Sequence, residues 1–289
     1  MNKKSLQYYY QKARKEGWAL AQFNFSSAEQ LKGIVEAAVA LHSPLLLGTS
    51  EGDSGFVGMG QAVAMVQQYR RETKLPIFLN FDHGKSVESV RAAMEAGYDA
   101  LHFDGSHLGF EENITVTKKI VRAARKKGIT VIEGEFGEIP GKHSAYHRER
   151  TIEITPDQLT DPGQAKEFAK QTGVDSLAVV IGNVHGMYQE NPRLDLARLQ
   201  NIRKEVQCFL VLHGGSGTPE RDLLSAIKIG IVKINISTEL RGAFTQGLRS
   251  TLEKNPEEIT PYKLFPEAVA ATRKVAEQKI SFFGSANRL

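Results

Sequence analysis

Two kinds of hydrophobic pattern alternate along the chain from Trp18 onward. Short runs of apolar and β-branched residues, typical of strands, are each followed by a longer stretch in which apolar residues recur at helical spacing. The strands are predicted to begin near Trp18, Pro44, Pro76, Ala100, Thr130, Ser176, Phe209 and Val232. The helices are predicted at 28–41, 60–71, 87–96, 112–127, 162–171, 196–205, 220–229 and 239–252.

This order of elements favours a closed (β/α)8 barrel over an open α/β sheet, which more often stops at five or six strands. Glycines follow four of the helical stretches, where a left-handed C-cap is expected, at Gly97, Gly128, Gly173 and Gly230. We therefore predict an α/β fold, a single TIM-barrel domain over residues 1–289, with an extra C-terminal helix. That tail starts near Pro261, ends in SFFGSANRL, and could cap the barrel or reach a neighbouring subunit.

The longest connection joins the fifth and sixth predicted strands. It contains the segment 138–156, EIPGKHSAYHRERTIEITP, which is polar and lacks a clear period. Long loops in compact domains usually serve as lids or binding loops. This segment is therefore a candidate active-site lid.

Composition and charge narrow the compartment and the partners. Cys208 is the one cysteine, so an internal disulfide is excluded, and no apolar run has the length of a signal-peptide core or a membrane span. We expect a cytoplasmic protein without membrane contact. The formal net charge is +4, but the lysines and arginines are scattered along the predicted helices instead of forming a basic tract. This balance suits a phosphorylated small molecule, and we expect no nucleic-acid partner.

Unusual polar residues fall at the carboxyl ends of the predicted strands. Barrel enzymes carry their chemistry on that face, because the βα loops meet there. In strand order the residues are Asn24, Ser50, Asp82, His83, Asp104, Glu135, His185, His213, Asn235 and Thr238. We therefore expect the active site at this end of the barrel.

Three of these residues, His83, His185 and His213, could converge on a tetrahedral zinc ion whose fourth position stays open for substrate. One histidine alone is more often satisfied by hydrogen bonds in the core, but three at one face favour a metal site. His42, at a helix end, and His102, within a strand, are expected to be structural. The remaining histidines, His107, His143 and His147, lie in predicted loops, where solvated and substrate-facing roles both stay open.

Glycine-rich segments accompany the later histidines. VVIGNVHGM (179–187) and LVLHGGSG (210–217) let backbone amides approach an anion, and Ser216 adds a hydroxyl. NIST (235–238) follows on the adjacent strand. Together they predict a phosphate site where barrels of this class often have one.

The chain resembles a known family in motifs that span nearly its whole length. FDHG, FDGSHLGFEEN, VIEGEFG, GVDSLAVVIGNVHGMY, LVLHGGSG, VKINISTEL and GSANR are similar to those of class II, metal-dependent ketose-bisphosphate aldolases. The resemblance implies a zinc barrel that reversibly cleaves a ketose 1,6-bisphosphate to dihydroxyacetone phosphate and an aldehyde. Fructose-1,6-bisphosphate, which yields glyceraldehyde 3-phosphate, is the first expectation, and tagatose-1,6-bisphosphate or another ketose phosphate is the alternative.

The resemblance also assigns residues. It implies zinc ligation by His83, His185 and His213, with Asp104 and Glu135 near the metal, and an acid/base role for Asp82 at the C4 hydroxyl. Contacts to dihydroxyacetone phosphate are implied for Gly186, Gly214, Gly215, Ser216, Asn235, Ile236, Ser237 and Thr238, and further substrate contacts for Asn24 and Ser50. Some family members hold a sodium or potassium ion beside the phosphate, and members are commonly homodimers or homotetramers.

The chemistry agrees with these roles. Cleavage of the C3–C4 bond leaves negative charge on the ketone fragment, which a zinc ion can stabilise as a Lewis acid, while a carboxylate must take the C4 hydroxyl proton. Asp82 and His83 are adjacent, however, and cannot both point inward on a regular strand. The strand must therefore end or bend at this point.

The chain departs from the family pattern in two places. The family lid carries a glutamate that exchanges the proton on the ketone fragment, but the aligned stretch here, 140–144, reads PGKHS. His143 could substitute, as could Glu138 or Glu149, or the substrate could differ. The second departure is on the third strand, where Asn80 replaces a common histidine and Lys85 a small or polar residue.

Two rival functions stay open from the sequence. A class I aldolase would form a Schiff base through Lys233, which lies inside the eighth predicted strand, but it would leave the three histidines without a purpose. Alternatively, the altered lid could belong to a barrel that binds a sugar phosphate without turnover.

Overall fold

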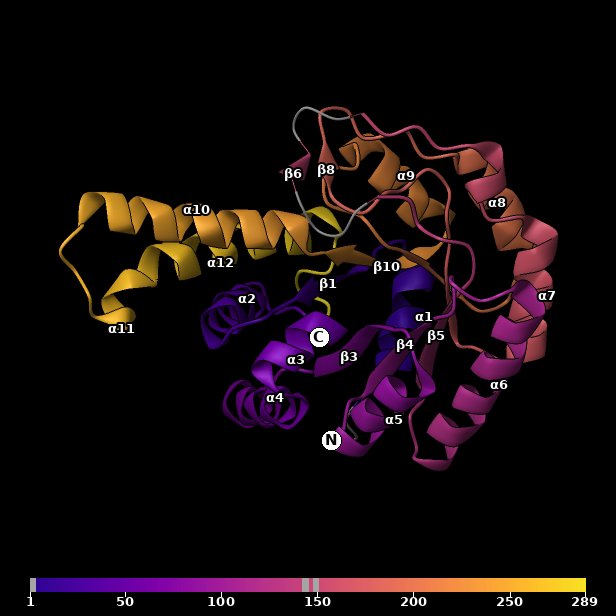
Figure 1. The fold of residues 1–289 in the computed structure, drawn as a ribbon, viewed down its shortest axis with the longest axis horizontal. Coiled ribbons are helices and arrows are strands. Elements are labelled where there is room, and N and C mark those ends of the chain that lie inside the picture. Colours follow the sequence, from indigo (N-terminus) through magenta and orange to yellow (C-terminus); the bar gives the residue numbers. More distant parts are fainter. Residues whose placement is uncertain (1–3, 142–145, 148–150) are drawn as a thin grey trace.

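The fold is a closed barrel of eight parallel strands, seen in a computed structural model that describes residues 4–141, 146–147 and 151–289. In chain order the barrel strands are β1 (Leu20–Asn24), β2 (Leu45–Ser50), β3 (Ile77–Gly84), β4 (Ala100–Asp104), β5 (Val131–Glu135), β7 (Ser176–Ala178), β9 (Phe209–Leu212) and β10 (Ile231–Ile236). Each pairs with the next, and β10 pairs with β1 to close the ring. The predicted TIM-barrel class is confirmed (Figure 1).

A helix follows every barrel strand, as the hydrophobic pattern predicts. These helices are α2 (Ala28–Ala40), α4 (Met59–Thr73), α5 (Val87–Ala96), α6 (Phe110–Lys126), α7 (Pro162–Thr172), α8 (Leu196–Glu205), α9 (Glu220–Ile229) and α10 (Thr238–Lys254). All four glycines expected after helices have positive φ, from 71° at Gly173 to 131° at Gly230. The sequence therefore marks the helix ends correctly.

Helix α1 (Leu6–Glu16) is not in the sequence prediction. Its signals are nevertheless present, because the Ser5 side chain caps its first turn and Gly17 ends it with φ of 71°. Its buried residues recur at positions i, i+3, i+4 and i+7, namely Leu6, Tyr9, Tyr10 and Ala13. A short helix, α3 (Glu51–Val57), was also missed directly after β2.

Helix α1 closes the amino end of the barrel. Its apolar face packs with Trp18 and with strand residues that point inward, and Tyr10 meets the ring of Phe209 at a centroid distance of 5.3 Å. We call this cluster the base layer; its strand residues are Leu20, Leu46, Ala100, Val131, Phe209 and Val232. A second and larger cluster fills the space between the barrel and its helices.

Further along the strands the barrel interior becomes polar. We call these side chains the polar layer; they are Gln22, Asn80, His102, Glu133 and Lys233, all buried. They lie between the base layer and the carboxyl ends of the strands. The barrel thus changes from apolar to polar along its axis.

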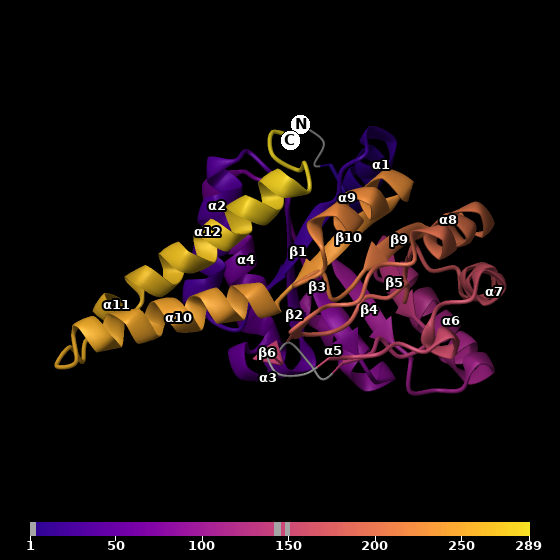
Figure 2. The same ribbon diagram turned by 90° about the horizontal axis from the view of Figure 1, so that it is seen from above.

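The C-terminal region forms an arm. Helices α10 and α12 (Pro266–Phe282) pack on each other and project from the barrel, with α11 (Pro261–Leu264) at the far end (Figure 2). The predicted extra C-terminal helix is therefore present. The tail beyond it returns to the barrel, where the Ala19 N–H donates to Phe283 and the Asn287 N–H to Leu41.

A two-stranded parallel sheet joins the candidate lid segment to the chain after β7. It pairs β6 (Tyr146–His147) with β8 (Met187–Tyr188). Neither strand belongs to the barrel. Across the described residues, we find no helix with the length and apolarity to cross a membrane.

Candidate active site

A pocket of about 610 Å³ opens at the carboxyl end of the barrel. Fourteen of the residues that the sequence assigns to the site line it: Asn24, Ser50, Asp82, His83, Asp104, Glu135, His185, Gly186, His213, Gly214, Ser216, Asn235, Ser237 and Thr238. The side chain of Ile236 instead lies in the outer core between barrel and helices. Gly215 packs against Ile234 and the backbone of Asn235, and His143 lies outside the described residues.

The strand bend predicted at Asp82 and His83 is a β-bulge. Phe81 pairs with Leu101 and Gly84 with Phe103, so two residues of β3 face a single residue of β4. His83 has φ of 51°, in the left-handed region that residues other than glycine seldom adopt. Because of this bulge, two consecutive side chains enter the pocket.

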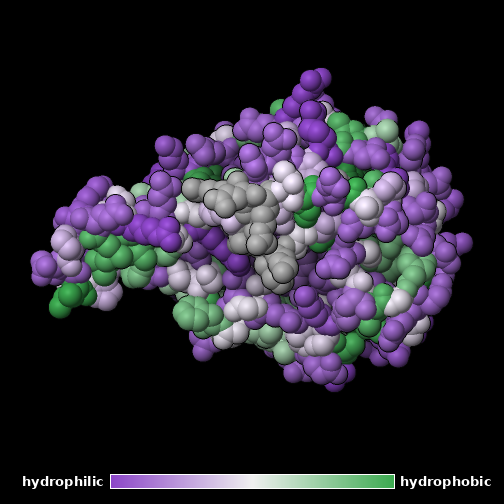
Figure 3. All heavy atoms as spheres, turned by 45° about the horizontal axis from the view of Figure 1, so that its top comes forward, coloured by the Kyte–Doolittle hydropathy of each residue, from purple (hydrophilic) through white to green (hydrophobic). Residues whose placement is uncertain are grey.

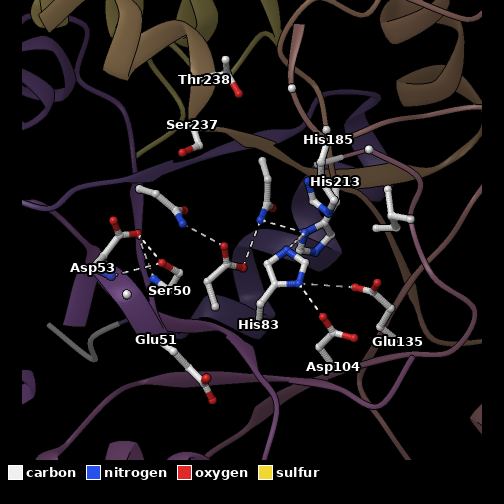
Figure 4. Close-up of a pocket in the computed structure, with 18 of the residues that line it drawn as sticks. Ser50, Glu51, Asp53, His83, Asp104, Glu135, His185, His213, Ser237 and Thr238 are labelled. Atoms are coloured by element: carbon white, nitrogen blue, oxygen red, sulfur yellow. Dashed lines mark hydrogen bonds and ion pairs between the residues drawn. The ribbon is translucent and has the colours of Figure 1, made fainter. Parts of the chain in front are cut away.

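The rings of His185 and His213 lie beside that of His83 (Figure 4). The Nε2 atom of His83 lies 2.9 Å from Nδ1 of His213, and the ring centroids of His83 and His185 are 5.1 Å apart. On its other side, His83 Nδ1 lies 3.1 Å from the Asp104 carboxylate and 3.8 Å from that of Glu135. The predicted metal residues are thus brought together from five different strands or the loops that follow them.

Two overlapping groups of donor atoms, within the described residues, are compact enough to hold a metal ion. One comprises Asp82, His83, His102 and His213, and the other His83, Asp104 and Glu135. His185 approaches the same rings from the loop after β7. Burial, followed by the neighbouring rings of His83 and His213, holds the pKa of His185 well below its ordinary value. The neutral form that results is the one that binds metals.

His213 is held from below by a buried ion pair that the sequence analysis missed. Its Nε2 lies 2.7 Å from Glu133 Oε1, and Lys233 donates to the other oxygen of Glu133 over 2.7 Å. Burial alone would raise the pKa of Glu133, but Lys233 and the nearby histidines lower it, so it stays ionised. An ionised Glu133 accepts a hydrogen bond from the Nε2–H group and leaves the lone pair of His213 Nδ1 facing His83.

Asp82 ends a directional chain of buried amides. Asn24 donates to one of its oxygens over 2.8 Å and Asn235 to the other over 3.1 Å. Behind Asn24, Gln22 donates to the Asn24 carbonyl over 3.0 Å, and Asn80 donates to Gln22 over 2.9 Å. A carboxylate only accepts hydrogen bonds, so it sets the direction of the whole chain.

The amide chain needs space on β2, where Gly48 lies. A Cβ atom on Gly48 would be 2.4 Å from the Asn24 carbonyl oxygen and 2.6 Å from the Gln22 nitrogen. Only glycine therefore fits without displacing both side chains. Asp82 keeps a depressed pKa because His83, His102 and His213 outweigh the effect of its burial.

A cradle for an anion lies across the pocket, at the start of α10. Gly214 and Gly217 have φ of 64° and 76°, and a Cβ on Gly214 would be 2.1 Å from the Val184 carbonyl oxygen. Ser237 immediately precedes α10, and its buried hydroxyl has no hydrogen-bond partner among the residues that the structure describes. The amino end of a 17-residue helix attracts negative charge. These features suit a phosphate group.

The described start of the candidate lid segment is tied to the loop that carries His185. The His185 N–H donates to the Pro140 carbonyl over 2.8 Å, and a Cβ on Gly141 would be 2.4 Å from the His185 carbonyl oxygen. Glu138 lines the pocket, as do four charged residues absent from the predicted site: Glu51, Asp53, Lys85 and Arg241. The candidate lid segment therefore begins at the wall of the pocket.

Lys233 has no access to a substrate in this pocket. Its side chain is 1% exposed, is paired with Glu133 and does not line the pocket. A Schiff base would need a free amine that reaches the ketone. The geometry therefore disfavours the class I alternative.

The fold and the site together define an α/β-barrel enzyme whose pocket combines a histidine cluster, a buried carboxylate and an anion cradle. The chain belongs to the class-II fructose-bisphosphate aldolase family, whose model matches residues 4–288. It is therefore an aldolase, a lyase of carbon–carbon bonds, and this family is generally metal-dependent.

Solved structures agree with this assignment. The YdjI aldolase from Escherichia coli K12 is 34% identical, with 98% of each chain covered and a TM-score of 0.83. A putative fructose-1,6-bisphosphate aldolase from Coccidioides immitis shares the fold at 24% identity, with 100% of this chain and 99% of that chain covered and a TM-score of 0.85. Fructose-bisphosphate aldolase from Campylobacter jejuni does so at 22% identity, with 97% and 94% covered and a TM-score of 0.81.

Proposed function

We propose that the protein is a zinc-dependent aldolase that reversibly cleaves a ketose 1,6-bisphosphate, with fructose-1,6-bisphosphate as the first candidate. The products would be dihydroxyacetone phosphate and glyceraldehyde 3-phosphate. The observation that carries the proposal is the approach of His83, His185 and His213 beside a buried carboxylate, Asp82.

The donor atoms fit a metal cation. His83 Nδ1 faces Asp104 and His213 Nε2 faces Glu133, so each ring donates an N–H hydrogen bond to a carboxylate. The two remaining nitrogens then face each other 2.9 Å apart, an approach that a proton or a cation between them would stabilise. Three neutral imidazoles with one open position form the donor set of catalytic zinc.

Each residue then has a task at a stated atom. His83, His185 and His213 would hold the ion, which when bound supplies Lewis-acid stabilisation of the negative charge on the ketone fragment. Asp82 would accept the C4 hydroxyl proton as the C3–C4 bond breaks, since each of its oxygens keeps a second acceptor position. Asp104 and Glu135 would orient His83 or offer the ion a second position.

The anion cradle would bind the phosphate of dihydroxyacetone phosphate. Gly186, Gly214, Gly215 and Ser216 would offer backbone amides, and Asn235, Ile236, Ser237 and Thr238 would complete the contact, Ile236 through its backbone. Asn24 and Ser50 would contact the rest of the substrate from the opposite wall. A sodium or potassium ion beside the phosphate belongs to the same proposal.

The second base, which exchanges the proton on the ketone fragment, would come from the lid. His143 is our first candidate, and Glu138 is supported by its place on the pocket wall. We expect substitution of the true second base to slow tritium release from labelled dihydroxyacetone phosphate by roughly 10²- to 10⁴-fold. His143→Ala and Glu138→Gln should be measured side by side, because unchanged release removes that residue from the role.

The assembly and the compartment complete the proposal. We infer a homodimer or homotetramer, supported by apolar side chains at the far end of the arm, where Ile259 is 87% and Tyr262 76% exposed (Figure 3). A cytoplasmic location fits the single cysteine. Sedimentation of the wild-type protein and of Ile259→Asp would test the assembly, and a wild-type monomer would contradict it.

A cleavage panel tests the proposed activity. Fructose and tagatose 1,6-bisphosphates and the corresponding 1-phosphates would be assayed through a coupled enzyme that consumes dihydroxyacetone phosphate, with and without a chelator. We expect cleavage that the chelator abolishes and zinc restores. Sugar-phosphate binding without cleavage of any substrate would favour the barrel without turnover.

A further inference from the structure

The β3 bulge, which admits Asp82 and His83 to the pocket together, faces one residue of β4. Between the pairs Phe81–Leu101 and Gly84–Phe103, that residue is His102. Bulges are uncommon between parallel strands and leave the extra residue without a partner in the ladder. The bulged residue here also has φ of 51°, which is unfavourable for a side chain other than glycine. Something outside the ladder must therefore hold it.

The His102 side chain supplies the missing partner. The backbone N–H of His83 donates to Nδ1 of His102 over 3.1 Å. His102 is 0% exposed, so bulk water cannot replace its ring as the acceptor for this N–H. A buried backbone N–H without an acceptor is costly, and this hydrogen bond removes that cost where the strand leaves its regular course.

The same contact distinguishes His102 from the proposed metal ligands. Its Nδ1 accepts a hydrogen bond from the backbone of His83, and its Nε2 lies 3.1 Å from a Glu135 carboxylate oxygen without a hydrogen bond to it. The ring also packs against those of His83 and His213, each at a centroid distance of 4.7 Å. Its contacts therefore support the ligands from below.

We propose that His102 is a positioning residue that fixes the β3 bulge, so that Asp82 and His83 enter the site in one defined arrangement. This inference rests on the proposed function, because it concerns how the metal ligand and the proton acceptor are oriented. Its chemistry is a single hydrogen bond from backbone to imidazole. A regular strand in place of the bulge would turn one of the two side chains out of the pocket.

Three variants of His102 separate positioning from packing. His102→Asn places its carbonyl oxygen where Nδ1 lies and keeps an acceptor for the His83 N–H. His102→Leu removes the acceptor, and His102→Gln moves the amide to the place of Nε2. Two measurements apply: hydrogen exchange of the single His83 amide in metal-free protein, by mass spectrometry with fragmentation, and zinc affinity by titration of the metal-free protein.

We expect exchange of the His83 amide to accelerate at least about tenfold in His102→Leu and His102→Gln. Their zinc dissociation constants should rise by roughly 10- to 100-fold, the usual effect of losing a group that orients a ligand. His102→Asn should keep both values close to wild type. If His102→Leu does not fold, the comparison of His102→Gln with His102→Asn carries the test.

Two outcomes would overturn the proposal. Unchanged exchange at His83 in both His102→Leu and His102→Gln would mean that the bulge does not depend on this hydrogen bond. Equal loss of zinc in all three variants, with the His83 amide still protected, would make His102 a direct ligand. Failure of the wild-type protein to cleave any ketose phosphate would refute the proposed function, but the exchange measurement would still decide the role of His102.

Discussion

The base layer and the polar layer fill the same barrel by opposite means. In the base layer, side chains such as Leu46 and Phe209 are held by contact area alone, which has no preferred direction. In the polar layer, every partner is specified by donor and acceptor, as in the pair of Glu133 with Lys233. The first layer can change shape at moderate cost, whereas the second loses a partner with almost any substitution.

This difference explains where the chemistry lies. Burying Glu133, Lys233 and His102 contributes little stability by itself, because desolvation offsets most of the gain from pairing. What the polar layer does provide is a fixed orientation for His83 and His213 directly above it and, through Asn24, for Asp82. The base layer supplies the stability that allows such a layer to exist.

The largest expected effect on activity comes from Asp82 and His213 themselves. We expect Asp82→Ala to keep zinc but to lower the cleavage rate by roughly 10²- to 10⁴-fold, because the group that accepts the C4 proton is lost. His213→Ala should lose zinc and cleavage together. Metal analysis beside the kinetics distinguishes the two, and zinc retained at full stoichiometry in His213→Ala would remove that residue from the ligand set.

The largest expected effect on stability comes from breaking the ion pair below the site. Lys233→Met leaves Glu133 buried without its cation, which should lower the free energy of unfolding by about 3–5 kcal/mol. Adding Glu133→Gln should recover much of this loss but not the zinc affinity, since His213 would still lack its carboxylate. Urea unfolding measures the first effect. Equal stability of Lys233→Met and wild type would show that the ion pair does not stabilise the fold.

Much of the fold could be predicted from the sequence, because strand and helix periods are local properties. All eight barrel strands and the helices after them lie where the pattern places them. Helix α1 was missed although Ser5, Gly17 and its apolar spacing mark it, because it precedes the repeating units. Its place below the barrel depends on the closed ring and is not a local property.

Only the part of the site at the carboxyl ends of the strands could be predicted from the sequence. Residues at strand ends, such as Asp82 and His213, are visible because polar side chains interrupt apolar runs there. Glu133 and His102 lie two positions before Glu135 and Asp104, so alternation places them on the same face of the strand, but nothing local says which partners they meet there. The bulge that aligns His83 with His102 depends on the register between two strands, which no single strand encodes.

A matched pair of substitutions compares the two layers directly. Gln22 and Leu46 lie side by side on paired strands, and both can be replaced by methionine at similar volume. Gln22→Met removes the donor to the Asn24 carbonyl and the acceptor for the Asn80 amide N–H, so we expect a loss of about 1–3 kcal/mol and slower cleavage. Leu46→Met should cost less than about 1.5 kcal/mol and leave cleavage unchanged. If Gln22→Met and Leu46→Met lose the same unfolding free energy and cleave at the same rate, the two layers do not differ in this way.

The smallest effect is expected at the rim of the base layer, where the chain ends meet. One oxygen of Glu16 accepts from the Trp18 indole over 3.1 Å and from Arg288 over 3.0 Å. Because Glu16 and Arg288 are both about a third exposed, solvent and salt screen the pair. We expect Glu16→Gln to lower the free energy of unfolding by less than about 1 kcal/mol, and by less still at high salt. A loss as large as that of Lys233→Met would mean that the base layer also depends on specified polar partners.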